Sequence, residues 1–424
     1  MKKDKLGVGL IGAGFMANFH IQSWQGVRGA DIVGLVGRTE SRAKAAAEKC
    51  RSLGVGNARV FSSVSDMVAD PEVDVVWICA PNNLRVPIMQ KIVKTIQSGR
   101  GKLVGVACEK PLAVNVREAR RMVELVERAG ILHAYLENQC YAPAVRRGRE
   151  IIWRRGAAAT GPPYLARCAE EHSGPHEPWF WKGDKQGGGV LNDMMCHSIQ
   201  AARIFLSDPA APKYSLCTRT VNAEIGCLKW ALPGYVEKLK KDSGGQVDYA
   251  KHPAEDFARA TVTFEDRNGR KAVAELSTSW SYVGPGLRLN FEVLGPEYSL
   301  ASSSLNTDLN IFFSRNVTGR EGGDLVEKQN AEQGVMPVVT SEEIVYGYTE
   351  QNRQVVRSFL AGQQPEVDFQ DGLLVTQILM AAYMSAEQGR KLTFPPPGLD
   401  DFVPAVAKGT WNPGDLTLGL PPEV

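Results

Sequence analysis

The chain has 424 residues, of which 43% are hydrophobic and 23% charged, as is usual for globular proteins. Its 49 Lys and Arg residues nearly balance its 47 Asp and Glu residues, so the composition does not resemble that of a basic nucleic-acid-binding protein, and we expect no nucleic-acid partner. No segment is long and apolar enough to span a membrane, so we expect no membrane partner. Gly12 and Gly14 interrupt the first apolar run, and no cleavage site follows it, so we expect a cytoplasmic protein without a signal peptide.

The first third of the chain alternates short apolar runs with amphipathic segments. This alternation is typical of a parallel sheet that helices cover on both faces. We expect strands at 6–12, 31–37, 73–80, 102–111 and 131–138, and helices at 15–27, 40–50 and 116–130.

The pattern changes after residue 138. A helical segment, a turn-rich break and a strand precede a helix that follows Gly187, Gly188 and Gly189. Between residues 214 and 301, apolar and polar residues alternate with period two, which predicts antiparallel strands. The other expected elements are the helical segment 143–155, the break 156–163, the strand 164–172, and the late helices 348–362 and 371–389.

The segment "GAGFMA" (12–17) follows the first predicted strand and opens a helix. Gly12 would make the tight turn, Gly14 would let the backbone approach a pyrophosphate, and Ala17 would allow close packing of helix on strand. A glycine turn between a strand and a helix can also be purely structural. The motif follows the first strand of a strand–helix series, which favours a dinucleotide site.

The end of the second predicted strand bears on the choice of cofactor. An NAD site commonly places a carboxylate there, whereas this chain has Gly37, Arg38 and Thr39, with Arg42 one turn later. Guanidinium groups suit a 2′-phosphate, which favours NADP. The alternative is that Arg38 stacks on the adenine and NAD binds without the acid.

Four motifs occur in one order along the chain: "GLIGAGFMANFH", "VVWICAPNNL", "ACEKPLA" and "GGGVLNDMMCHSIQAARIFL". In order and approximate spacing they resemble the Gfo/Idh/MocA oxidoreductases, over about residues 5–394. The resemblance implies an α/β protein with a Rossmann domain (1–138). It also implies an α/β domain (139–424) with a large, mostly antiparallel open sheet that supports a homodimer or homotetramer.

The resemblance also implies an activity. Members bind NAD or NADP and transfer a hydride to or from a hydroxyl carbon of a sugar, polyol or related compound. Matched by motif, Lys110, Asp193 and His197 become the catalytic set. The cofactor-binding residues so expected are Gly12, Gly14, Phe15, Met16, Arg38, Thr39, Arg42, Pro81, Asn82, Glu109 and Lys110.

Asp193 and His197 lie four residues apart, on one face of the predicted helix. A catalytic zinc needs three protein ligands, and no third residue has a suitable spacing, so we expect no metal. A solvated polar face is the second alternative. A proton relay needs a base that titrates near neutral pH, an orienting acid and a nearby cation, which His197, Asp193 and Lys110 supply.

The loop before the glycines, "EEHSGPHEPWFWKGDKQ" (170–186), combines aromatic and charged residues. Such a loop suits the faces and hydroxyl groups of a sugar, and its alternative is a structural loop whose tryptophans fill the edge of a sheet. The expected substrate-binding residues are Lys110, His172, His176, Trp179, Trp181, Asp193 and His197.

Two residues depart from the family pattern. Arg85 stands where many members have a histidine, and Cys140 stands where many have an arginine. Arg85, with Lys182 and Lys185, would be able to meet an anionic group on the substrate. A few branches of the family are glycosidases that oxidise the sugar only transiently with a retained NAD. That activity, on a neutral or anionic glycoside, is the alternative function, and a binding protein without chemistry is a third.

Overall fold

The structure is a computed structural model that describes residues 4–317 and 323–415. The chain forms two compact units. The first comprises Met1–Ala142 and Tyr346–Thr376, and the second comprises Pro143–Val345 and Gln377–Val424. The expected division at residue 138 lies close to the end of the first segment. It does not anticipate that residues 346–376 belong to the first unit.

The first unit contains a six-stranded sheet in which every neighbouring pair is parallel, as predicted. In spatial order the strands are β3 (Arg59–Val60), β2 (Ala30–Val36), β1 (Leu6–Ile11), β4 (Val75–Ile78), β5 (Gly105–Glu109) and β6 (Leu132–Leu136). The strand order reverses between β1 and β4. In doubly wound sheets, ligands bind beyond the carboxyl ends of the strands at such a reversal.

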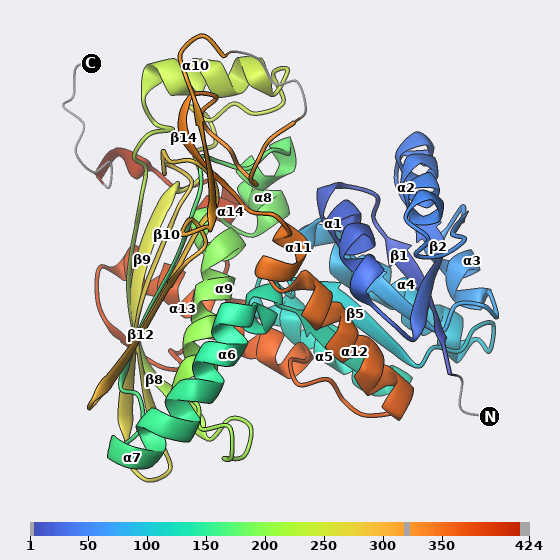
Figure 1. Ribbon diagram of the computed structural model, residues 1–424, viewed down its shortest axis with the longest axis horizontal. Helices are drawn as coiled ribbons and strands as arrows, with labels where there is room; N and C mark the ends of the chain where they lie inside the picture. Colours follow the sequence, from blue (N-terminus) through green and yellow to red (C-terminus); the bar gives the residue numbers. More distant parts are fainter. Residues whose placement is uncertain (1–3, 318–322, 416–424) are drawn as a thin grey trace. The chain divides into compact units, whose positions relative to one another are not determined.

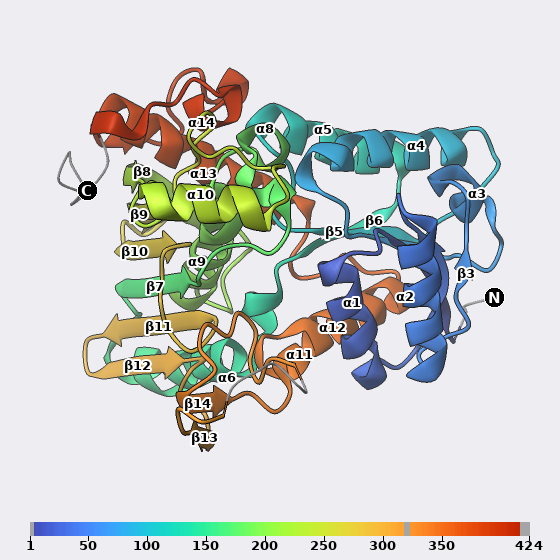
Figure 2. The ribbon, with the colours of Figure 1, turned by 90° about the horizontal axis from the view of Figure 1, so that it is seen from above.

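Helices cover both faces of this sheet, with α1, α2 and α12 on one face and α4 and α5 on the other (Figure 2). The helical segments are α1 (Phe15–Ser23), η1 (Trp24–Gly26), α2 (Glu40–Ser52), α3 (Val64–Ala69), η2 (Asn82–Leu84), α4 (Arg85–Gln97), α5 (Val116–Ala129), η3 (Asn138–Tyr141) and α12 (Tyr348–Ala361). The indole N–H of Trp77 donates to the Asn352 side chain over 3.0 Å and ties α12 to β4. This buried contact is one reason why residues 346–376 belong to the first unit.

The second unit contains a seven-stranded sheet. In spatial order its strands are β12 (Tyr298–Ser303), β11 (Arg288–Gly295), β7 (Leu165–Glu171), β10 (Lys271–Ser279), β9 (Phe257–Asp266), β8 (Leu216–Gly226) and β15 (Leu392–Thr393). Only β7 and β10 run parallel, so the sheet is mostly antiparallel, as predicted. A separate two-stranded sheet pairs β13 (Leu309–Phe313) with β14 (Gly334–Val338).

The two faces of the seven-stranded sheet differ in chemistry. In β9 and β10, most buried positions hold small or apolar residues, whereas most alternate positions hold polar residues that are more exposed. The long helix α9 (Val190–Leu206) runs alongside these strands and packs on β7 and β10 (Figure 1). On the polar face, Arg167 forms ion pairs of 2.6 Å with both Glu275 and Glu292.

The remaining helical segments of the second unit connect or flank its sheet. They are α6 (Pro143–Ile151), η4 (Ile152–Ala157), α7 (Ala158–Thr160), η5 (Pro178–Trp181), α8 (Gly183–Gln186), α10 (Pro233–Asp242), α11 (Glu342–Val345), η6 (Leu399–Asp401), α14 (Ala405–Lys408) and η7 (Pro413–Asp415). Helix α13 (Phe369–Gln388) crosses the boundary between the units. The break expected at 156–163 begins only at Gly161, because the alanines at 157–159 favour helix. Within residues 4–317 and 323–415, no helix is both long enough and apolar enough to span a membrane.

Candidate active site

The turn between β1 and α1 has the geometry that the glycine motif predicts. Gly12 has a φ of +118°, and a Cβ at this position would lie 2.7 Å from the carbonyl oxygen of Cys79. Gly14 precedes α1, and a Cβ there would meet no atom within 4 Å. Gly12 is therefore needed for the turn itself, while Gly14 leaves open space before the helix N-terminus. That space fits a pyrophosphate bound to the backbone N–H groups.

The other expected cofactor residues follow strands of the same sheet. Arg38, Thr39 and Arg42 are exposed beyond the end of β2, where they are accessible to a ligand. After β4, Pro81 is partly exposed and Asn82 is buried. Within α1, Phe15 is 41% exposed, Met16 is half-buried, and Ala17 is buried.

Lys110 directly follows β5, and the carboxylate of the preceding residue, Glu109, is buried. One oxygen of Glu109 lies 2.7 Å from Nε2 of His20, and the other accepts the backbone N–H of Lys110 over 3.1 Å. Burial raises the pKa of Glu109, but the hydrogen bond and charge of His20, with the charges of Arg85 and Lys110, outweigh this effect and lower it. Glu109 is therefore an ionised group that holds the loop, in the same unit as the glycine turn.

Arg85 does not have the position expected of a group that meets an anionic substrate. Its side chain is 3% exposed and donates to backbone carbonyl groups on both sides of Lys110. The expectation of an anion contact at Arg85 is therefore wrong in this structure. A guanidinium with its donors occupied by carbonyls has little capacity left for a ligand.

The glycine triplet before α9 makes room for two side chains. A Cβ at Gly188 would lie 2.0 Å from the Tyr383 hydroxyl, and one at Gly189 would lie 2.5 Å from the carbonyl oxygen of Glu255. The Glu255 carboxylate accepts the backbone N–H groups of Gly189 and Leu191 over 2.9 and 3.1 Å, and the Tyr383 hydroxyl donates to that carboxylate. Burial raises the pKa of Glu255 to about 7.

Helix α9 carries Asp193 and His197 in surroundings unlike a solvated face. All 17 residues of the helix are buried, which makes that alternative wrong. Asp193 accepts a hydrogen bond of 3.3 Å from the indole N–H of Trp280. Nε2 of His197 lies 3.9 Å from a carboxylate oxygen of Glu170, which points inward from β7.

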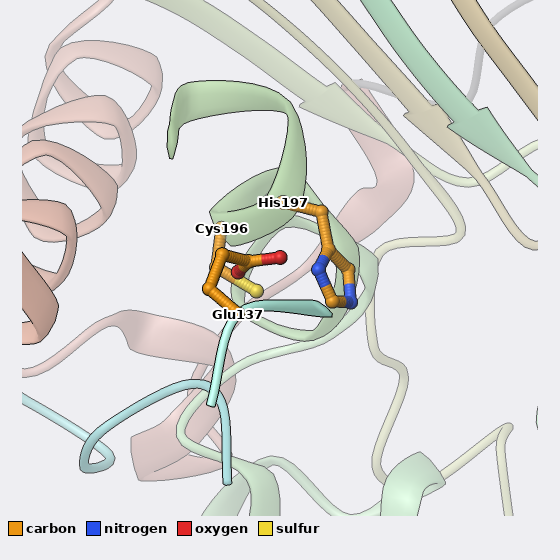
Figure 3. A group of neighbouring side chains, drawn as sticks. All are labelled: Glu137, Cys196 and His197. Carbon is orange, nitrogen blue, oxygen red and sulfur yellow. The ribbon is translucent and has the colours of Figure 1, made fainter. Parts of the chain in front are cut away.

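Cys196 and His197 occupy successive positions of α9 (Figure 3). The Cys196 thiol donates to the carbonyl oxygen of Asp193 over 3.2 Å. This is a local contact within one helical turn. Glu137, also drawn in Figure 3, belongs to the first unit and directly follows β6.

The expected substrate loop divides into buried and more accessible residues. Trp181 is 3% exposed and packs against Trp230 and Trp280, with ring centroids 4.9 and 5.0 Å away, which favours the structural alternative for this residue. His172 is also buried, and its Nδ1 accepts the backbone N–H of Gly174. By contrast, His176 is exposed, and Trp179 is half-buried and stacks on Phe180.

Three side chains near the helix, Trp280, Glu255 and Tyr383, were not singled out from the sequence, whereas Glu170 begins the loop 170–186 that was expected to meet the substrate. Glu170 gives one usable signal, because it is an acid at an inward position of a strand whose previous inward residues are Ala166 and Cys168. The others gave none, since their contacts with α9 join residues distant in sequence.

Comparisons with known proteins agree with this architecture. A model described as an oxidoreductase family with an NAD-binding Rossmann fold matches residues 6–135, and the GFO/IDH/MocA C-terminal domain matches residues 156–301. Levoglucosan dehydrogenase from Pseudarthrobacter phenanthrenivorans is 25% identical over 399 residues, which cover 90% of this chain and 96% of that protein. 1,5-Anhydro-D-fructose reductase from Ensifer adhaerens is 29% identical over 205 residues, which cover 48% of this chain and 57% of that protein.

Among solved structures, GenD2 from gentamicin A biosynthesis, in complex with NAD, is similar with a TM-score of 0.72 and 25% identity. The match covers 93% of this chain and 97% of that one. The two matched domains occur in sequence order and together account for most of the chain. This protein therefore belongs to the Gfo/Idh/MocA family of NAD-dependent dehydrogenases and reductases.

Proposed function

We propose that this enzyme transfers a hydride between a nicotinamide cofactor and a hydroxyl carbon of a sugar, polyol or sugar derivative. The observation that carries the proposal is the buried pair on α9: Asp193, held by Trp280, and His197 one turn later. An imidazole next to fixed carboxylates is suited to accept and return a proton. The relatives named for levoglucosan and 1,5-anhydro-D-fructose support a carbohydrate substrate.

We assign three roles to the catalytic set. In the oxidative direction His197 accepts the substrate hydroxyl proton at its imidazole, and it returns that proton during reduction. Asp193 stabilises the charged imidazole, and the Lys110 ammonium donates to the substrate oxygen, where negative charge develops. The nicotinamide, when bound, supplies the hydride acceptor or donor, which no side chain provides.

The residues that would hold the cofactor lie in the first unit. Gly12 forms the tight turn, and Gly14 leaves open space that we assign to the pyrophosphate, beside Phe15 and Met16 at the start of α1. Pro81, Asn82, Glu109 and Lys110 follow β4 and β5, and we place them at the nicotinamide end. Exposed Arg38, Thr39 and Arg42 support NADP, because no carboxylate occupies residues 37–39. The NAD complex of GenD2 supports NAD as the alternative.

Of the expected substrate loop, His176 and Trp179 are the residues for which we propose substrate contacts, together with the catalytic set. The accessible residues Trp179 and His176 are the better candidates for direct contact with sugar hydroxyl groups and ring faces. Buried Trp181 and His172 are better suited to support them. We place the reaction in the cytoplasm, since all eight cysteines are free thiols.

We further propose a homodimer or homotetramer built on the polar face of the seven-stranded sheet. This face carries a concavity of about 910 Å³ and the exposed ion pairs of Arg167 with Glu275 and Glu292. Alternating charges of this kind are self-complementary between two copies related by a two-fold axis. Sedimentation of the wild-type chain and of Arg167→Glu tests the proposal, and a wild-type monomer would contradict it.

The experiment that tests the activity is a screen of free sugars, polyols and sugar acids with NAD and NADP in both directions. We expect a change in reduced cofactor with at least one carbohydrate. The matched controls are Lys110→Ala and His197→Ala, which should lose this activity. Cleavage of chromogenic glycosides without net change in cofactor would instead support the glycosidase alternative.

A further inference from the structure

Arg85 begins α4 directly after the loop that leaves β4, and its guanidinium is buried against main-chain carbonyl groups. Nε donates to the backbone carbonyl of Ala80 over 3.1 Å, and Nη1 donates to the backbone carbonyl of Glu109 over 2.6 Å. Nη2 donates to the carbonyl of Lys110 over 3.0 Å, and Nη1 also donates to the carbonyl of Pro111. One side chain thus binds three successive carbonyls of the loop that contains the proposed catalytic lysine.

A second set of contacts holds the same loop through the Glu109 side chain. His20 lies 2.7 Å from that carboxylate, and its other ring nitrogen lies 3.0 Å from the amide nitrogen of Asn352. All three side chains are buried. Arg85 therefore holds the main chain of residues 109–111, and His20 holds the side chain of Glu109. The Cα of Lys110 consequently has little freedom to shift.

The chemistry of guanidinium explains how one side chain can bind these carbonyl groups together. Its five N–H donors form a planar fork of fixed geometry, so several acceptors can be bound in defined directions at once. A lysine ammonium is a compact group on a flexible stem and cannot reproduce this arrangement. The hydrogen bonds are charge-assisted and are stronger than those between neutral groups.

We propose that Arg85 is a positioning residue for Lys110: by binding the carbonyls of Glu109, Lys110 and Pro111, it fixes the lysine in its catalytic position. The proposal rests on the proposed function only for the role of Lys110. Displacement of a catalytic group by about 1 Å can lower turnover about 100-fold even when binding is preserved. Loss of Arg85 should accordingly lower kcat more than it changes KM or cofactor affinity.

The test compares Arg85→Ala and Arg85→Lys with Arg51→Ala, a matched control. Arg51 also donates to a backbone carbonyl in the first unit, that of Ala58 over 3.2 Å, but it does not touch this loop. Three quantities are measured: backbone hydrogen exchange over residues 105–113, steady-state kcat, and KM. All three measurements are then repeated with added guanidinium ion. Arg85→Lys retains the charge and serves if Arg85→Ala does not fold.

We expect faster exchange over 105–113 and a loss of kcat of about 10- to 100-fold in both Arg85 variants, with KM changed less than about threefold. Guanidinium should partly restore kcat in Arg85→Ala, and Arg51→Ala should behave as wild type. Unchanged exchange in the Arg85 variants would overturn the proposal, as would faster exchange with unchanged kcat. A wild-type enzyme inactive on every carbohydrate would contradict the proposed function instead, since the exchange measurement tests the loop contacts without turnover.

Discussion

The Nε2 atom of His197 lies 3.9 Å from the carboxylate of Glu170, and both side chains are buried within the second unit. Glu170 comes from the end of β7, whereas Asp193 comes from the same helix as the histidine. His197 therefore has a carboxylate on a strand opposite it as well as one on its own helix. The strand carboxylate adds a second source of stabilisation for the charged imidazole formed during substrate oxidation.

The first prediction concerns this strand carboxylate. Glu170→Gln should lower kcat for oxidation by about tenfold, equivalent to about 1.4 kcal/mol, because the charged imidazole loses a nearby negative charge. The matched control is Glu171→Gln, since Glu171 points to the other face of the sheet and pairs with Arg288. Equal effects of the two substitutions would show that Glu170 has no special relation to His197.

The second prediction concerns His197 itself. His197→Ala should lower turnover by about two to four orders of magnitude, the usual contribution of general acid–base catalysis. Binding of reduced cofactor, measured by fluorescence titration, should change little, because the residues assigned to the cofactor lie in the first unit. Cys196→Ala is the control for loss of a neighbouring buried side chain. Near-normal turnover of His197→Ala would remove histidine from the mechanism.

The third prediction concerns stability and pH. The Glu255 pKa rises from 4.5 to about 7 on folding because the side chain is buried, so the folded state binds more protons than the unfolded state between these values. The free energy of unfolding should therefore fall as pH rises from 4.5 towards 7, by up to about 3 kcal/mol from this group.

Urea denaturation at pH 5 and pH 8 measures this effect. Glu255→Gln has no charge to bury, so its stability should decrease less over the same interval. Glu224→Gln, at an exposed ion pair with Arg259, is the control and should keep the wild-type slope. A pH dependence identical in wild type and Glu255→Gln would show that Glu255 does not titrate in this range.

The fourth prediction concerns cofactor choice. If Arg38 binds a 2′-phosphate, Arg38→Ala should weaken NADP binding by about 1.5–3 kcal/mol, or one to two decades, and NAD binding far less. Calorimetric titration of both cofactors provides the measurement. Equal losses for NAD and NADP would indicate that Arg38 only stacks on the adenine.

The parts of the fold that follow from local patterns could be predicted from the sequence. The helix 116–130 has an Asn115 cap and ends at Gly130, whose φ is +62°, so both ends carry local signals. Strand β3 pairs through only two residues and α3 has only six residues, so neither produces a periodic pattern. The return of α12 to the first unit depends on a contact between Trp77 and Asn352, which no local pattern reveals.

The candidate site divides in the same way. Gly12 and the Asp193–His197 spacing are local signals that the sequence shows directly. The structure explains why a glycine stands at position 12, since a Cβ there would collide with the carbonyl oxygen of Cys79. Arg85 was visible as a departure from the family pattern, but its contacts depend on where β5 ends. Trp181 was ambiguous because an aromatic residue in a loop serves a ligand or a core equally well, and only its neighbours Trp230 and Trp280 distinguish them.

The central claim is net hydride transfer to or from a carbohydrate, and its most direct test is stoichiometry. With a substrate identified in the screen, reduced cofactor is followed by its nicotinamide absorbance while the product is quantified in the same sample. We predict one equivalent of cofactor converted for each equivalent of product, and no conversion of either with His197→Ala above about 1% of the wild-type rate. Product formed from a glycoside with a constant level of reduced cofactor would contradict the account.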